Sequence, residues 1–236
     1  MAPRRPPGRR ATPIRPSKGS PSNKSGKRDQ QRERRRKLWI RASVGTGLAV
    51  ALLAVLFLTG SHKAGSNFPY ASGSPGSGAV APTFTLPSTA GGTFDLASMR
   101  GKTTLLYFQE GTDCEPCWTQ LHDIQNDMSA FHRAGINSVV SITTNSLGDL
   151  QQKASDEGIR LPVLSDPTLA VSHAYSANQY GMMGTMSDGH SFVVVGPTGT
   201  IEWRGDYGGA PNYTMFVPDQ TLLKQMRAGM ARAPGM

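Results

Sequence analysis

The chain has 236 residues, and its formal net charge of +9 is unevenly distributed. Residues 1–63 hold 16 of the 25 lysines and arginines but two of the 16 acidic residues, so the remainder carries a net negative charge. This distribution argues against a nucleic-acid-binding globular domain, because the excess positive charge belongs to an N-terminal tail.

The N-terminal quarter of the sequence predicts a tail and a membrane span. Residues 1–37 are rich in Pro, Arg, Ser, Gly and Lys, and such a segment buries too little apolar surface to offset its chain entropy, so we expect a disordered basic tail. An uncharged apolar run follows at 42–60. A helix of this length spans about 28 Å, close to the thickness of the bilayer's hydrocarbon core, so we assign residues 38–60 to one N-terminal transmembrane helix.

The charges around this run predict its orientation. Basic residues precede the run and few follow it, which places the N-terminus in the cytoplasm and the rest of the chain outside the cell membrane. A cleaved signal peptide is the alternative, although the long tail and long run favour an anchor. We therefore expect the lipid bilayer as a partner and no nucleic acid. Residues 61–80, rich in Gly, Ser, Pro and Ala, predict a flexible linker to a domain at 81–236.

The domain opens with a predicted hairpin near 83–96, and strands and helices alternate after it. Residues 103–109 form an apolar run of strand length, typical of a strand buried on both faces. Apolar residues then recur at helical spacing from Trp118 to Phe131, and Gly135 is a plausible helix end. Further strands are expected at 136–144, 161–166, 190–196 and 200–206, and helices at 146–158, 167–176 and 218–230. The pattern predicts an α/β fold with a central mixed sheet flanked by helices.

Both cysteines of the chain lie in the stretch DCEPCW, between the buried strand and the helix. Cys114 would stand at the helix N-terminus, where unpaired N–H groups and the helix dipole stabilise a thiolate. Cys117, one turn on, is near enough to close a reversible disulfide with Cys114. Glu115, Pro116 and Trp118 would shape the site, since a proline is tolerated in the first helical turn.

Two other uses of the cysteine pair compete with redox chemistry. A structural disulfide gains little here, because so short a loop hardly constrains the unfolded chain. Half of a zinc site would need a second Cys pair or paired histidines, and the sequence has neither. Redox chemistry at Cys114 and Cys117 is therefore the favoured prediction.

The residues around the cysteines resemble those of a known group of proteins. The stretches APTFTLPSTAGGTFDLASMRGKTTLLYFQEGTDCEPCW, LPVLSDPTLAVSHAY and VVVGPTGTIEWR occur in the order found in thioredoxin-superfamily redoxins, the AhpC/TSA peroxiredoxins and the membrane-anchored TlpA/ResA-type thiol–disulfide oxidoreductases. The resemblance covers residue 81 to the C-terminus and implies a thioredoxin-like fold with Cys114 as attacking and Cys117 as resolving thiol. Together with the predicted topology, it favours an extracytoplasmic thiol–disulfide oxidoreductase that acts on a disulfide-bearing protein or a small oxidant and is re-reduced by a thiol donor.

The chain departs from these families at several positions. Peroxiredoxins carry P-x-x-x-[TS]-x-x-C, but Tyr107 and Gly111 occupy the Pro and Thr/Ser positions here, and the loop at 181–191 contains no arginine. A thiol peroxidase with antioxidant activity is therefore the alternative function. The same loop lacks the proline that thioredoxin-type enzymes place opposite their cysteines.

His190 lies near the end of this loop and is the third candidate catalytic residue. A hydrogen-bonded residue at the start of the next strand is the alternative role. The stretch DGHSFVVVGPTG resembles Sco copper chaperones, which implies an alternative Cu(I) site formed by Cys114, Cys117 and His190. No other cofactor is expected. Three nearby methionines are predicted to pack inside the loop, with weak coordination of that copper as the alternative: Met182, Met183 and Met186.

Three acidic residues, Glu110, Asp113 and Glu115, flank Cys114. Negative neighbours raise the pKa of a thiol, whereas the helix N-terminus and a protonated His190 would lower it. We expect the acidic neighbours to make the reduced form an electron donor, closer to thioredoxin than to a strong oxidant.

Overall fold

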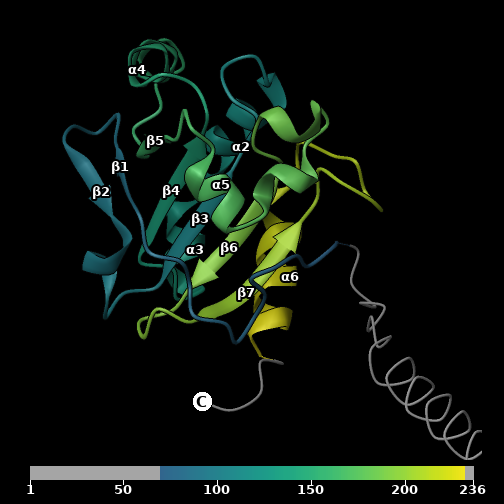
Figure 1. The fold of residues 1–236 in the computed structure, drawn as a ribbon. Helices are drawn as coiled ribbons and strands as arrows, with labels where there is room; N and C mark the ends of the chain where they lie inside the picture. Colours follow the sequence, from purple (N-terminus) through teal and green to yellow (C-terminus); the bar gives the residue numbers. More distant parts are fainter. Residues whose placement is uncertain (1–69, 232–236) are drawn as a thin grey trace, which may run out of the picture. The chain divides into compact units, whose positions relative to one another are not determined.

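A computed structural model describes residues 70–231 (Figure 1). The predicted tail, the predicted span and residues 61–69 of the predicted linker lie outside the described residues. Over residues 70–231, no helix combines the length and the apolar character needed to cross a membrane.

A five-stranded mixed sheet, ordered β5-β4-β3-β6-β7, forms the centre of the domain. Its strands are β3 (Thr104–Phe108), β4 (Ser138–Thr143), β5 (Val163–Ser165), β6 (Ser191–Val195) and β7 (Ile201–Asp206). The first three are parallel, and β6 and β7 are antiparallel to their neighbours. Every residue of β3 is buried, which confirms the prediction of a central strand covered on both faces.

Helices cover both faces of the sheet (Figure 1). They are α2 (Glu115–Asn126), α3 (Met128–Arg133), α4 (Leu147–Asp156), α5 (Ala170–Ala174) and α6 (Asp219–Met230), with 3-10 turns η1 (Leu96–Met99), η2 (Ala177–Tyr180) and η3 (Gly184–Met186). Alternate residues of β3 divide the core: Leu105 and Tyr107 pack with α2, α3, α4 and α6, and Leu106 and Phe108 pack with α5 and η1. The hairpin of β1 (Thr85–Pro87) and β2 (Thr93–Asp95) forms as predicted.

The helix predicted to run from the cysteines to Gly135 is divided into α2 and α3. Asp127 lies between them with φ −96° and ψ 15°, outside regular helical geometry. The side chains of Asn126 and Asp127 can hydrogen-bond to nearby backbone groups in place of the helical partners, and both residues therefore favour the end of a helix at this point. The apolar face nevertheless continues through the break, and Phe131 of α3 is buried beside Ile124 of α2.

The segment at 70–80, which we assigned to the flexible linker, is packed against β7. Tyr70 is 2 % exposed, and its hydroxyl accepts a hydrogen bond from the Trp203 indole at 2.9 Å. The backbone N–H of Gly73 donates to the Asp206 carboxylate at 2.7 Å. The domain thus begins before the predicted boundary at residue 81. Composition did not reveal this, because backbone pairing to a sheet edge makes little demand on side-chain type.

Candidate active site

Cys114 and Cys117 form a disulfide at the start of α2, with a Cα–Cα distance of 5.3 Å. Cys114 is the N-cap residue of α2, as predicted, and Pro116 lies within the first turn. Cys114 is half-buried, whereas Cys117 is fully buried. An incoming thiolate or substrate can therefore reach the Cys114 sulfur, while the Cys117 sulfur faces the protein interior.

The residues beside the cysteines fix the start of α2. The buried Trp118 donates from its indole nitrogen to the Gly111 carbonyl at 3.1 Å, which ties the helix to the loop before it. Glu115 is exposed and lies 3.5 Å from the Lys153 ammonium. Trp118 therefore holds the site from beneath, and Glu115 contributes charge at its surface.

Asn145, which the sequence analysis missed, holds the loop that carries Cys114. Its side-chain oxygen accepts the Thr112 backbone N–H at 3.0 Å, and its amide donates to the Thr112 hydroxyl at 3.0 Å. Gly111 has a φ of +116°, and a Cβ there would come within 2.0 Å of the Asn145 oxygen. Asn145 follows β4, so its position next to the end of the parallel strand β3 was the available signal.

His190 lies beneath α2 and not at the surface beside the Cys114 sulfur. It is fully buried, and its Nδ1 is 3.1 Å from the Tyr107 hydroxyl, which also donates to the Cys117 carbonyl at 3.4 Å. Burial lowers the pKa of His190 to about 3, so the imidazole is neutral at physiological pH. The condition under which His190 would stabilise the thiolate, a protonated imidazole, is therefore not met, and desolvation is the reason.

The alternative Cu(I) site is not assembled. Within residues 70–231, no group of three or more His, Cys, Asp or Glu side chains is placed to hold a metal ion. The two sulfurs are bonded to each other, and His190 contacts Tyr107 through its Nδ1. In the disulfide form the three predicted ligands thus do not form one site.

Cys114 opens into a pocket of about 550 Å³. Its lining consists of Glu110, Asp113, Cys114, Pro116, Met182, Met183, Met186, Ser187 and Met215. The first three methionines of this lining are 59 %, 73 % and 84 % exposed, so the prediction that they pack inside the loop is wrong. The loop is held at Cys114 by Glu110, whose Oε1 accepts the backbone N–H groups of Met182 and Met183.

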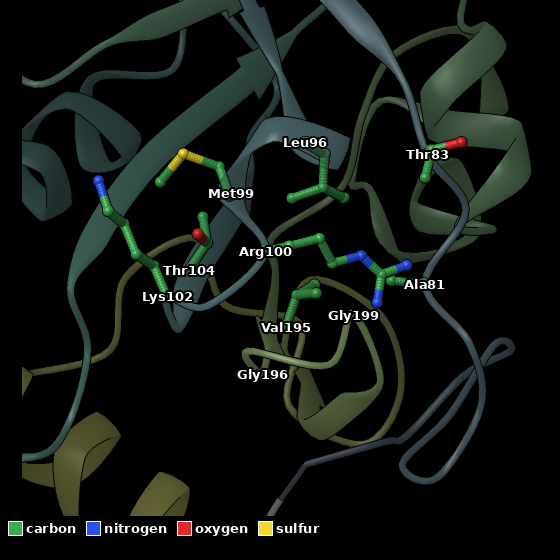
Figure 2. Close-up of a pocket in the computed structure, with 10 residues that line it drawn as sticks. All are labelled: Ala81, Thr83, Leu96, Met99, Arg100, Lys102, Thr104, Val195, Gly196 and Gly199. Atoms are coloured by element: carbon green, nitrogen blue, oxygen red, sulfur yellow. The ribbon is translucent and has the colours of Figure 1, made fainter.

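A different pocket, at the opposite end of the sheet, has no room for a substrate. It lies near the start of β3 at Thr104 and beside Val195 of β6, and its volume is about 10 Å³. Figure 2 shows Arg100 extending its guanidinium towards Ala81 and Gly199 within it. This space suits about one water molecule. The pocket at Cys114 is the candidate substrate site because the accessible cysteine lines it.

Asp219, at the start of α6, has an unusual charge environment. It is 6 % exposed, and its Oδ1 accepts a hydrogen bond from Gln120 at 3.0 Å. Burial, and then the nearby carboxylates of Asp123 and Asp127, raise the pKa of Asp219 from 3.8 to about 7. All three aspartates line a pocket of about 420 Å³ that opens to solvent.

We expect Asp219 to make folding stability fall as pH rises. The folded state keeps a proton that the unfolded chain releases near pH 4, so this contribution is fully present below pH 4 and is lost progressively up to about pH 7. In Asp219→Asn this pH-dependent loss should disappear. Above pH 7 the free energy of unfolding of the variant should therefore exceed that of wild type by about 1–2 kcal/mol, a value reduced to allow for solvent screening. Urea unfolding at several pH values measures it, and a loss as large in Asp219→Asn as in wild type would contradict it.

Comparison with known proteins identifies the family and the fold. The family model described as "AhpC/TSA family" matches residues 77–204. A putative peroxiredoxin of Mycobacterium tuberculosis is 34% identical over 100 residues, covering 42% of this chain and 63% of that protein. Peroxiredoxin Bcp of Escherichia coli is 27% identical over 113 residues, covering 48% of this chain and 72% of that protein.

Two solved structures share the fold at low sequence identity. Peroxidoxin BcpB of Mycobacterium tuberculosis superposes with a TM-score of 0.54 and 17% identity, over 65% of this chain and 97% of that one. The reduced 2-Cys peroxiredoxin of Plasmodium vivax gives a TM-score of 0.54 and 20% identity, over 64% of this chain and 94% of that one. The predicted thioredoxin-like fold is thereby confirmed. Since the family model spans more than half of the chain, this protein belongs to the AhpC/TSA family of thioredoxin-superfamily redoxins.

Proposed function

We propose that the chain is a thiol–disulfide oxidoreductase that cycles Cys114 and Cys117 between a dithiol and a disulfide. The main support for this proposal is that the two cysteines differ in solvent exposure. Cys114 is half-buried at the N-cap of α2 and lines a pocket of about 550 Å³, whereas Cys117 is fully buried behind it. A helix N-terminus stabilises a thiolate, which makes Cys114 the attacking residue. Only Cys114 needs to be accessible to the substrate, because Cys117 resolves the mixed disulfide from inside the protein.

The reaction then runs in two exchange steps. The Cys114 thiolate attacks one sulfur of a substrate disulfide, forms a mixed disulfide and displaces the other sulfur as a thiolate. Cys117, after losing its proton, attacks the Cys114 sulfur and releases the second substrate thiolate. Two electrons pass to the substrate, whose thiolates take up the two protons lost by the cysteines, and a thiol donor must re-reduce the pair.

The charges around Cys114 favour the reducing direction. Glu110 and Asp113 line the pocket, Glu115 is exposed next to Cys114, and none of the residues lining the pocket is basic. Because His190 is neutral, it does not offset these carboxylates. We expect a reduction potential more negative than about −180 mV, the value typical of protein disulfide isomerase.

Thiol peroxidase activity is the second candidate, and the relatives favour it, because they are named peroxiredoxins. Here the Cys114 thiolate would attack a peroxide O–O bond, giving a sulfenic acid and an alcohol or water, and Cys117 would condense with it to give the disulfide and water. The pocket at Cys114 contains no arginine to polarise the peroxide. Tyr107 and Gly111 also differ from the peroxiredoxin motif, so we rank this activity second.

A single-turnover comparison separates the two functions. The reduced full chain is mixed with hydroxyethyl disulfide or with hydrogen peroxide, and the loss of the two thiols is followed over time. We expect oxidation by the disulfide to depend on protein concentration and to exceed that of free cysteine at the same pH. A peroxide reaction more than about a thousandfold faster than free cysteine, with a slow disulfide reaction, would make peroxidase the primary activity.

We also propose that residues 38–60 anchor the chain in the cell membrane, with the redox domain outside the cytoplasm. The apolar run and the preceding basic residues support this topology. Protease added to intact cells from which any outer barrier has been removed should digest the domain and spare the tail. Recovery of the intact chain in the soluble fraction would overturn the proposal.

A further inference from the structure

The pocket at Cys114 combines an apolar wall with negative charge. Four of its nine lining residues are methionines, and we name the space the methionine pocket. Glu110 and Asp113 also line it, and no lysine, arginine or histidine does. The proposed function explains the role of Cys114 but not why methionines and carboxylates surround it.

The three methionines of the 181–187 loop are unusually exposed for apolar side chains. Met182, Met183 and Met186 are 59 %, 73 % and 84 % exposed, although burying an apolar side chain of this size stabilises a folded protein. Exposed apolar clusters of this kind mark binding surfaces. Methionine suits such a surface, because its flexible, polarizable side chain adapts to partners of different shape.

The loop is held in place next to the Cys114 sulfur. Glu110 accepts the backbone N–H groups of Met182 and Met183, and the Asn178 amide donates to the Thr185 carbonyl at 3.3 Å. A Cβ on Gly181 would lie 3.1 Å from the Glu110 carboxylate, so the backbone approaches this side chain closely. These contacts fix the backbone of the loop beside the reacting atom.

The negative charge of the methionine pocket favours cationic ligands over anionic ones. The Lys153 ammonium, which contacts Glu115, is 2.6 Å from Glu157 and 3.5 Å from Glu115, so its charge is already matched. Glu110 and Asp113 thus present a negative potential to anything that approaches Cys114. Small anionic thiols and fatty-acid hydroperoxides carry carboxylates and are disfavoured, whereas a cationic group is attracted.

We propose that the methionine pocket binds a polypeptide segment in which the reacting cysteine has a bulky apolar residue on one side and a lysine or arginine on the other. The apolar residue packs on the methionines, and the cation faces Glu110 and Asp113. This proposal rests on the proposed function and assigns its substrate class. The covalent step is the first exchange described above: Cys114 bonds to the sulfur of the segment, and the other substrate sulfur leaves as a thiolate.

Three hexapeptides test the proposal against the reduced full chain. Each carries one cysteine activated as a mixed disulfide with thionitrobenzoate, and they differ only in the flanking pair: Leu and Arg, Leu and Glu, or Ser and Arg. At low salt we expect the Leu/Arg peptide to react about tenfold faster than the Leu/Glu peptide, and the Ser/Arg peptide to lie between them. Salt at 1 M should reduce the charge preference to about twofold and leave the apolar preference.

Substitutions in the pocket test which residues cause the preference for Arg over Glu and the preference for Leu over Ser. Glu110→Gln with Asp113→Asn should reduce the Arg-over-Glu preference to about twofold at low salt, since glutamine can still accept the loop N–H groups. Met186→Gln should reduce the Leu-over-Ser preference, whereas Met186→Leu should keep it. Val80→Gln is the matched control: Val80 is 73 % exposed and pairs with Thr200 at the opposite end of the sheet, so both preferences should stay.

Hydroxyethyl disulfide, which is small and neutral, separates the possible failures. If it oxidises the protein but the three peptides react within twofold of one another, or the Leu/Glu peptide reacts fastest, the proposed substrate class is wrong and the oxidoreductase function stands. If it does not react at all, both are overturned. A preference that persists unchanged in Glu110→Gln with Asp113→Asn would also exclude the charge mechanism.

Discussion

Cys114→Ser is expected to lower disulfide exchange by at least about a thousandfold, because a serine hydroxyl is not ionised near pH 7 and cannot take the place of a thiolate. Cys117→Ser should behave differently. Its Cys114 is half-buried and free to attack, but the chain has no further cysteine to resolve the mixed disulfide. The substrate should therefore remain covalently bound to Cys114.

Mass spectrometry of the two variants after exposure to hydroxyethyl disulfide measures this difference. An adduct of one mercaptoethanol per chain is expected on Cys114 in Cys117→Ser, and the double variant Cys114→Ser with Cys117→Ser is the control without any thiol. The reverse pattern, with rapid adduct formation on Cys117 in Cys114→Ser, would exchange the two roles. Such a result would require the buried Cys117 to become accessible, against its 0 % exposure.

The parts of this site that were predicted from sequence are those that depend on local pattern. The apolar run of β3, the helical spacing after Cys117 and the proline in the first turn fix where the cysteines stand. A short loop, residues 109–114, separates the end of β3 from the start of α2, so the local sequence placed Cys114 at the helix start and Cys117 one turn further on, within reach of a disulfide.

The parts that were missed depend on contacts between distant segments. Asn145 reaches the loop at Thr112 only because β4 lies beside β3 in the sheet. Glu110 holds the methionine loop across 72 residues of chain, so no local pattern reveals that those methionines face solvent. The sequence also left the charge state of His190 open, because the desolvation that lowers its pKa comes from the surrounding aromatic rings of Tyr107 and Phe192.

The early start of the domain has a further consequence for its stability, through the ion pair of Arg204 and Asp206. Both side chains are fully buried, and the guanidinium binds both carboxylate oxygens, with Nε 2.9 Å from Oδ2 and Nη2 3.0 Å from Oδ1. Arg204 also donates to the Tyr175 carbonyl at 2.6 Å and the Pro75 carbonyl at 3.2 Å. Asp206 in turn accepts the Gly73 N–H. The pair therefore joins the 70–80 segment and the end of α5 to β7.

Asp206→Ala is expected to lower the free energy of unfolding by about 3–5 kcal/mol, because it leaves the Arg204 guanidinium buried without a countercharge. The solvent-accessible pair of Lys153 and Glu157 is the matched control, and Lys153→Ala should cost at most about 1 kcal/mol. Urea unfolding followed by circular dichroism gives both values. Replacing both partners, as Arg204→Met with Asp206→Leu, should cost less than Asp206→Ala alone, since no unpaired charge remains. If the single variant loses no more than the Lys153 control, then the 70–80 segment is held by Tyr70 and its backbone pairing alone, and the buried pair contributes nothing to its attachment.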